Sequence, residues 1–175
     1  MDGSAGVDEW LAVLDELLVR PFPEPPEDPI HHVTLAESED FFDDVFYVRY
    51  EKVAKQFEAD RERLAAAVTA RYGPPERKDL TPYYSRWSGE PGEALFNYLT
   101  LWIFEIDLWR VGDRGVVVEV GQQDKELPLE LMIVVGDLTH ERRAGLNHPA
   151  TPLPRLELPR IEWPAHRHVF RFGLT

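Results

Sequence analysis

Carboxylate side chains in the middle of the chain are the first residues whose type and spacing could support chemistry. Apolar and polar residues alternate over 101–109, and further apolar runs cover 116–120 and 127–135, which predicts three strands. The positions predicted to face outward include four acids: Glu105, Asp107, Glu119 and Glu130. Neighbouring carboxylates shift one another's pKa, and they can act as general acid and base or hold a divalent cation. A metal- or carboxylate-dependent enzyme is therefore one reading of this face.

The predicted strand register places a tryptophan among these acids. If Gly115 is the left-handed residue of a three-residue loop, Trp109 lies opposite Glu119 and Leu108 lies opposite Val120. A two-residue loop would mix acids with valines and is disfavoured, because the buried face sets the register. An aromatic residue surrounded by charges is typical of a protein interface. We therefore predict a partner-binding face, and the alternatives are a solvated face or one covered by another element. Its residues are Glu105, Asp107, Trp109, Glu119 and Glu130.

Histidines are the other candidates for chemistry, since six are present, including the neighbours His31 and His32. On a strand His166 and His168 would point to the same side and could ligate a metal if Glu162 or His140 approached. The spacing matches no specific zinc motif, and arginines nearby would repel a cation. We therefore assign no catalytic residue, no metal ligand and no cofactor.

Several common activities lack their sequence motifs. The chain has no glycine-rich phosphate loop, no serine in a Gly-x-Ser-x-Gly turn and no cysteine. Nucleotide hydrolysis, serine hydrolase chemistry and thiolate chemistry therefore have no support. A cysteine-free composition is typical of a reducing cytosol, and no N-terminal secretory signal or spanning segment is recognisable, so we predict a cytoplasmic protein.

The net charge of −13 is concentrated at one end of the chain. Residues 1–60 hold sixteen acidic and four basic residues, whereas residues 122–175 hold seven of each. An acidic lobe repels phosphate groups, so nucleic acid and membrane surfaces are poor partners. A basic protein is the predicted partner, bound through residues 24–60 and the acidic sheet face, as in antitoxin-like inhibitors or chaperones. The alternative is that these acids only keep the protein soluble.

Two helices and two connectors are predicted outside the sheet. Apolar residues at helical spacing predict an amphipathic helix over 7–19 and a long helix over 51–71. Residues 45–50 fit either a strand or the start of that helix. Thr34 and Glu37 match a capping box, so a helix is also expected to begin there. Prolines make 21–29 and 149–164 connectors.

These elements predict a single α+β domain over residues 1–175. An antiparallel meander of about four to five strands packs against one or two helices on one face, and 168–172 could supply a further strand. A third reading of the function follows from the same sheet: a homodimer that buries the Trp109 face between two copies.

Overall fold

The computed structural model describes residues 3–25, 27–41, 46–84 and 94–139. The helices are α1 (Gly3–Val19), α2 (Phe46–Tyr72), α3 (Thr81–Tyr84) and α4 (Ala94–Leu99). The strands are β1 (Ile30–Glu37), β2 (Glu76–Asp79), β3 (Glu105–Val111), β4 (Arg114–Gln122) and β5 (Leu129–Asp137). The connector 149–164, His166, His168 and the strand expected over 168–172 lie outside the described residues.

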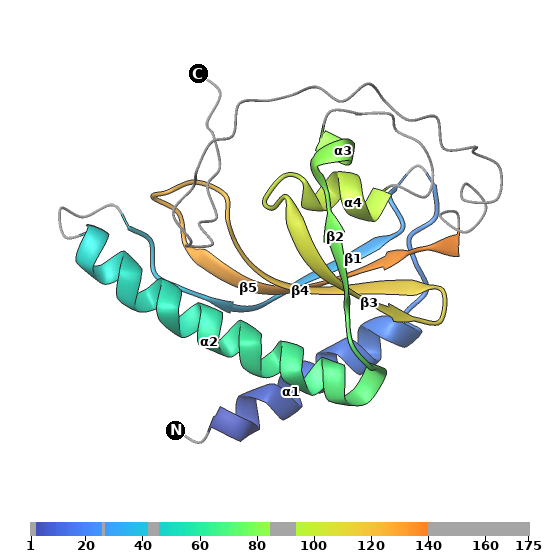
Figure 1. Cartoon of the computed structure of the whole chain (residues 1–175), viewed down its shortest axis with the longest axis horizontal. Helices are drawn as coiled ribbons and strands as arrows, with labels where there is room; N and C mark the ends of the chain where they lie inside the picture. Colours follow the sequence, from blue (N-terminus) through green and yellow to red (C-terminus); the bar gives the residue numbers. More distant parts are fainter. Residues whose placement is uncertain (1–2, 26, 42–45, 85–93, 140–175) are drawn as a thin grey trace.

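The strands form one antiparallel sheet in the order β1-β5-β4-β3-β2 (Figure 1). This confirms the predicted α+β class with a meander, since β3, β4 and β5 are consecutive neighbours. The long helix α2 and the N-terminal helix α1 lie together on one face of the sheet. Within the described residues no helix is long and apolar enough to span a membrane.

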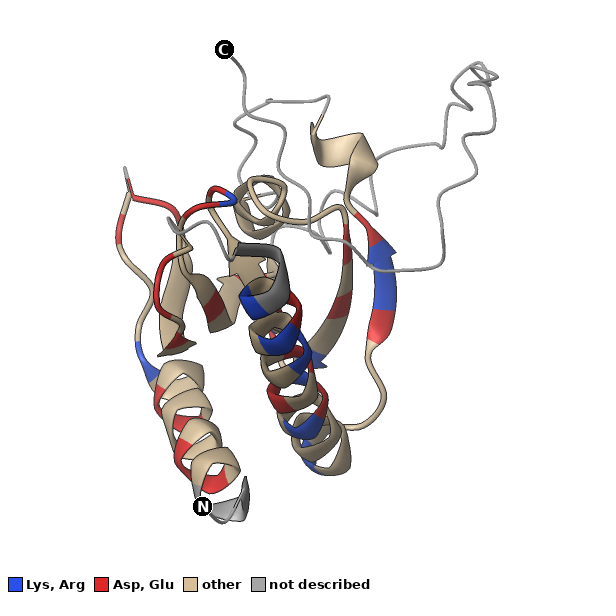
Figure 2. Ribbon diagram, turned by 90° about the vertical axis from the view of Figure 1, so that its left-hand side faces the viewer, with Lys and Arg blue, Asp and Glu red and all other residues tan. Residues whose placement is uncertain are grey.

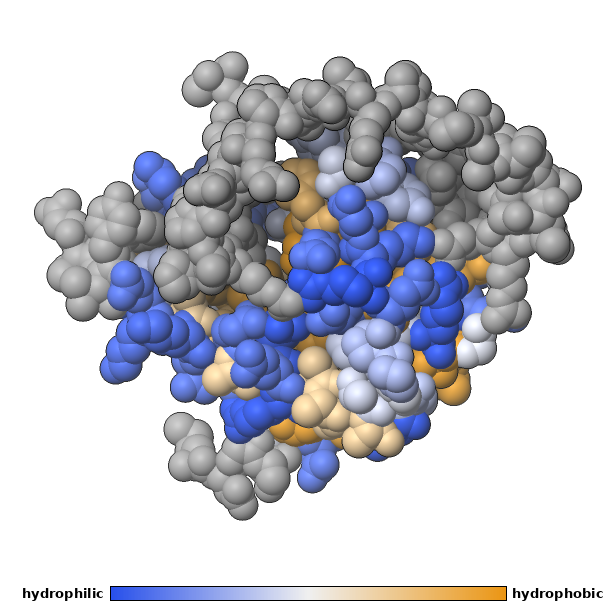
Figure 3. Space-filling view, in the orientation of Figure 1, coloured by the Kyte–Doolittle hydropathy of each residue, from blue (hydrophilic) through white to orange (hydrophobic). Residues whose placement is uncertain are grey.

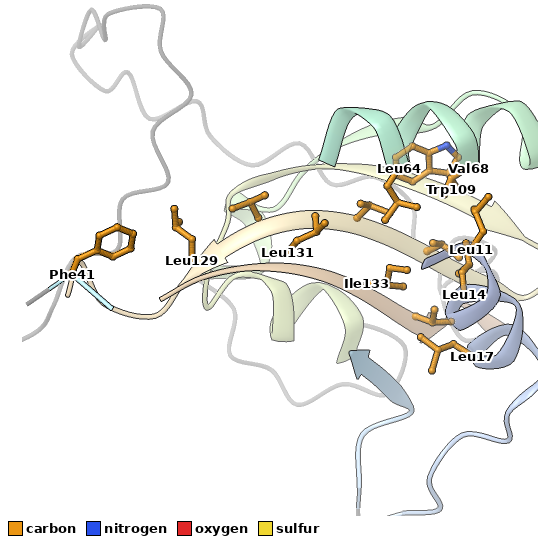
Figure 4. Packing of buried hydrophobic residues seen from close by; sticks show 14 residues of the cluster. Leu11, Leu14, Leu17, Phe41, Leu64, Val68, Trp109, Leu129, Leu131 and Ile133 are labelled. Atoms are coloured by element: carbon orange, nitrogen blue, oxygen red, sulfur yellow. The ribbon is translucent and has the colours of Figure 1, made fainter. Parts of the chain in front are cut away.

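The helix-covered face contains the larger apolar core. Leu11, Leu14 and Leu17 of α1, together with Leu64 and Val68 of α2, pack against alternate residues of the central strands (Figure 4). These side chains recur at three- and four-residue intervals, which is the spacing that places them on one helical face. The amphipathic patterns of 7–19 and 51–71 therefore correctly identified both helices.

The opposite face of the sheet is also covered, which was one of the alternatives that the sequence left open. The short helix α4 places Leu95, Phe96 and Leu99 over a second buried cluster. A Cβ atom added to Gly136 would lie 2.7 Å from the Cβ of Leu95, so the glycine permits the helix to approach the strand directly. Met132 and Val134 of β5, expected to face outward, are buried in this cluster.

The hairpin between β3 and β4 has a different register from the predicted one. Val111 pairs with Arg114 across the two-residue loop Gly112-Asp113, and Trp109 pairs with Val116 rather than with Glu119. Gly112 has a φ of 62°, as a glycine at the first loop position of a type II′ hairpin does. The three-residue loop would require the acids and the valines to occupy opposite faces, whereas Val117 and Glu119 lie on the same face of β4.

The register correction places Trp109 in the core. Its side chain is 1% exposed, lies in the same cluster as Val68 and Val116, and donates a hydrogen bond from Nε1 to Thr69 Oγ1 at 3.1 Å (Figure 4). The expected face with Trp109 exposed among acids is therefore wrong. Trp109 instead anchors α2 to β3.

One local pattern in the N-terminal half was also misleading. Thr34 and Glu37 lie in β1 and not at the start of a helix, so the capping-box prediction is wrong. Helix α2 begins at Phe46, which decides the open question for residues 46–50 in favour of a helix.

Strand β2 was not predicted at all, because its sequence Glu-Arg-Lys-Asp has no apolar residue to form a pattern.

We expect Trp109→Ala to lower the free energy of unfolding by about 3–5 kcal/mol, because it removes a large buried ring and the hydrogen bond to Thr69. Urea denaturation measures this change. Phe104→Ala is the control, since Phe104 is 45% exposed and should cost much less. A loss for Trp109→Ala as small as the control's would contradict the burial of Trp109.

Candidate functional site

The predicted site residues do not form one open acidic face. Asp107 and Trp109 lie on the α2 side of the sheet. Glu119 and Glu130 occupy strand positions that alternate with the core residues of that side, so they lie on the opposite face. Trp109 and Glu119 are both buried. Whether these residues bind a partner stays untested, but the shared exposed surface that motivated this role is not present.

Arginines neutralise the acids on β3. Arg77 of β2 forms ion pairs with Glu105 and Asp107, and the side chain of Arg77 is 40% exposed. The hydrogen bond to Glu105 is the largest cause that raises the Arg77 pKa, and burial acts in the opposite direction. These contacts hold the short strand β2 against β3 by side chains as well as by the strand ladder.

A second arginine lies under the long helix. The side chain of Arg61 on α2 is only 6% exposed, contacts Glu58 at 2.6 Å and lies 3.9 Å from Asp107. Burial lowers the pKa of Arg61, but the hydrogen bond to Glu58 and the negative charges of Glu119, Glu58 and Asp107 outweigh it, so the pKa is raised. Arg61 is thus a buried cation surrounded by carboxylates.

Several acids in the N-terminal part of the described chain are not neutralised. Six of them, on α1, in the connector before β1 and at the end of β1, are exposed and form no ion pair with any described residue. They are Asp8, Glu9, Glu24, Glu27, Asp28 and Glu37. Figure 2 shows acidic positions along α1, whereas acidic and basic positions intermingle along α2. Exposed acids without an ion pair also occur elsewhere in the described chain, as at Glu62 and Glu126, but on α1 and before β1 they are less interspersed with basic residues.

The surface seen in Figure 3 contains no broad apolar area among the described residues. Hydrophilic side chains dominate this face, and apolar atoms show in small areas between them. Large apolar side chains with substantial exposure are few in the described chain, and they include Val19, Tyr84 and Phe104. Charge rather than apolar surface is thus the stronger feature for recognition on this side.

The pair His31 and His32 is split between the two faces of the sheet. His31 stacks on Phe22 with ring centroids 5.1 Å apart, whereas His32 lies beside Tyr98 and Trp102. Adjacent residues of a strand point to opposite sides, so the two rings cannot ligate one metal. No group of three metal-binding side chains occurs in the part of the chain that the structure describes.

His32 forms a small polar cluster that sequence reasoning missed. Its Nδ1 lies 2.7 Å from the hydroxyl of Tyr98, and its buried Nε2 has no hydrogen-bond partner among the described residues. Glu130 lies close enough for its charge to act on both rings, and it accepts a hydrogen bond from Thr34 at 2.9 Å. Only the pairing of β1 with β5 and the position of α4 bring these residues together, so no local sequence signal could have found the cluster.

Burial lowers the pKa of His32, and the opposing effect of the Glu130 charge is smaller. A second proton on the ring would leave a buried N–H group at Nε2 without an acceptor. The cluster therefore favours the neutral imidazole. It ties the edge strand β1 to α4 through the contact with Tyr98.

Protein-family models, curated proteins and solved structures were compared with this chain, and none of them matches it.

We expect Arg61→Ala to lower the free energy of unfolding by about 3 kcal/mol, because it removes a cation whose side chain is only 6% exposed and breaks its contacts with Glu58 and Asp107. The matched control is Arg77→Ala, whose more exposed ion pairs should contribute about 1 kcal/mol or less. Chemical denaturation of both variants tests this. Equal losses would show that Arg61 is not the central counter-charge.

We expect His32 to destabilise the fold in acid. Because its pKa in the folded protein is lower than the ordinary 6.5, the unfolded chain binds more protons, and stability falls as the pH drops below about 6.5. Denaturation curves at a series of pH values should show a smaller acid loss for His32→Gln than for the unaltered chain. An NMR titration that placed the pKa of His32 above 6.5 would contradict this prediction.

Proposed function

We propose that this chain is a non-enzymatic, acidic interaction domain that binds a basic protein, in the manner of an inhibitor or a chaperone. The observation that carries the proposal is the contrast between two sets of acids. Acids of the sheet such as Asp107 are already paired with arginines, whereas six N-terminal acids, among them Glu27 and Asp28, are exposed and unpaired among the described residues. Acids that form no ion pair within the described chain are available to pair with basic residues of another protein.

The unpaired acids are well placed to accelerate association. Charges at the surface steer an oppositely charged protein during diffusional encounter, and this effect weakens with added salt. Residues 1–60 carry a net charge of −12, which includes residues outside the described part. The same charge disfavours nucleic acid and anionic lipid surfaces. A cytosolic location belongs to this proposal, since the sequence contains no cysteine.

The two alternative functions have less support. A carboxylate enzyme needs acids that can exchange protons with a substrate, but Glu105 and Asp107 are held by Arg77, and Asp107 also by Arg61. A homodimer through the Trp109 face lacks its anchor, because Trp109 lies in the core of the single chain. Neither alternative explains the unpaired acids.

The test uses the full chain immobilised at low salt, exposed to a lysate of the cells that produce it, and eluted with rising salt. We expect a basic protein to be released in stoichiometric amount, and its association rate should fall as salt is added. Retention that does not depend on salt, or recovery of no basic protein, would contradict the proposal.

Charge-reversed variants then locate the surface. Glu27→Lys with Asp28→Lys should slow association with the recovered protein by about tenfold, because both acids are exposed and unpaired. The control is Glu62→Lys with Ala66→Lys and Ala70→Lys, which changes the net charge equally on the exposed side of α2. If both variants slow association to the same extent, only net charge matters and no local surface exists.

A further inference from the structure

The two edges of the sheet differ in how they are protected. β2 has four residues, all of them charged, and short charged strands resist pairing with another chain. β1 has eight residues, contains no lysine, arginine or proline, and carries charge only at Glu37. It pairs with β5 on one side, and no described strand pairs with its other side. β1 is thus the less protected edge.

The regular part of β1 is long enough to accept another strand. Residues 30–34 pair with β5 in continuous register, and a bulge follows between Thr34 and Ala36. The bulge limits the region that a neighbouring strand can pair with, since it twists the edge locally. Thr34 is exposed at the end of the regular stretch. About five residues of regular edge are therefore presented.

Acids surround this edge at both ends. Glu27 and Asp28 precede β1, and Glu37 ends it; all three are exposed and unpaired among the described residues. Glu39 follows with its side chain 88% exposed and one ion pair to Arg49. The sequence from residue 21 to residue 48 contains eight acids and no lysine or arginine. The chain segments that precede and follow β1 are therefore predominantly acidic, with Arg49 as a cation paired to Glu39.

We propose that β1 accepts an extended, basic segment of the partner protein as an additional strand of the sheet. This inference rests on the proposed function and specifies the docking element. In this mode of recognition main-chain hydrogen bonds to the edge supply affinity, and side chains supply specificity. Basic residues at the two ends of the segment would meet Glu27 and Asp28 at one end of β1 and Glu37 at the other. An eight-residue strand spans about 27 Å, so the basic ends lie roughly eight residues apart.

The experiment uses the full chain and a synthetic nine-residue peptide that has two lysines at each end and alternating valine and threonine between them. We expect calorimetric binding at low salt, together with slower amide hydrogen exchange in β1 than in the free chain. Methylating the backbone nitrogens along one edge of the peptide keeps its charge but removes donors, and this should weaken binding at least tenfold. A peptide with glutamates in place of the lysines should not bind.

Each other outcome overturns strand addition. Equal binding of the methylated peptide would mean that charge alone holds it, which leaves the proposed binding of a basic protein intact. Absence of peptide binding to a chain that still captures a basic protein would place the docking surface elsewhere. If the β1 amides of the free chain are already as protected as those of β5, the edge is occupied, either by this chain or, where protection depends on concentration, by a second copy.

Discussion

The structure depends on the burial of the central strands from both sides. Every residue from Gly115 to Gln122 of β4 is buried, because α1 and α2 cover one face of the sheet and α4 covers part of the other. Apolar side chains are therefore required on both faces, which explains the continuous run of valines from Val116 to Val118. A charged residue in this layer needs a counter-charge nearby. Glu119 is buried there, and its negative charge acts on Arg61 of α2.

Two-sided burial also explains which parts of the fold could be predicted from the sequence. The periodicity of 7–19 and 51–71 was sufficient to predict two helices, and the patterns over 101–109 and 127–135 were sufficient to predict strands, which the structure places at 105–111 and 129–137. The register was not predictable from alternation, because both sides of β4 are apolar and a shift leaves the pattern almost unchanged. β1 was misread because the local capping pattern at Thr34 was overridden by long-range pairing with β5.

The candidate site shows the same division between local and long-range information. An excess of acid in the N-terminal third can be counted from the sequence. Which acids are neutralised cannot be counted, because Arg61 and Asp107 are far apart in sequence and meet only when α2 packs on the sheet. The sequence therefore indicated the sign of a partner's charge, whereas the structure separated the acids that stabilise the fold from those that face solvent.

The pairing of the first strand with the last has a consequence for biosynthesis. Ile30 of β1 pairs with Gly136 of β5, so the sheet cannot be completed until almost all of the described chain has been made. Until then the apolar face of α1 lacks the β5 surface on which it packs in the finished fold. Such non-local closure is slow and leaves apolar surface exposed in the nascent chain. The dense negative charge of this early segment would repel other nascent copies during that interval and so reduce aggregation.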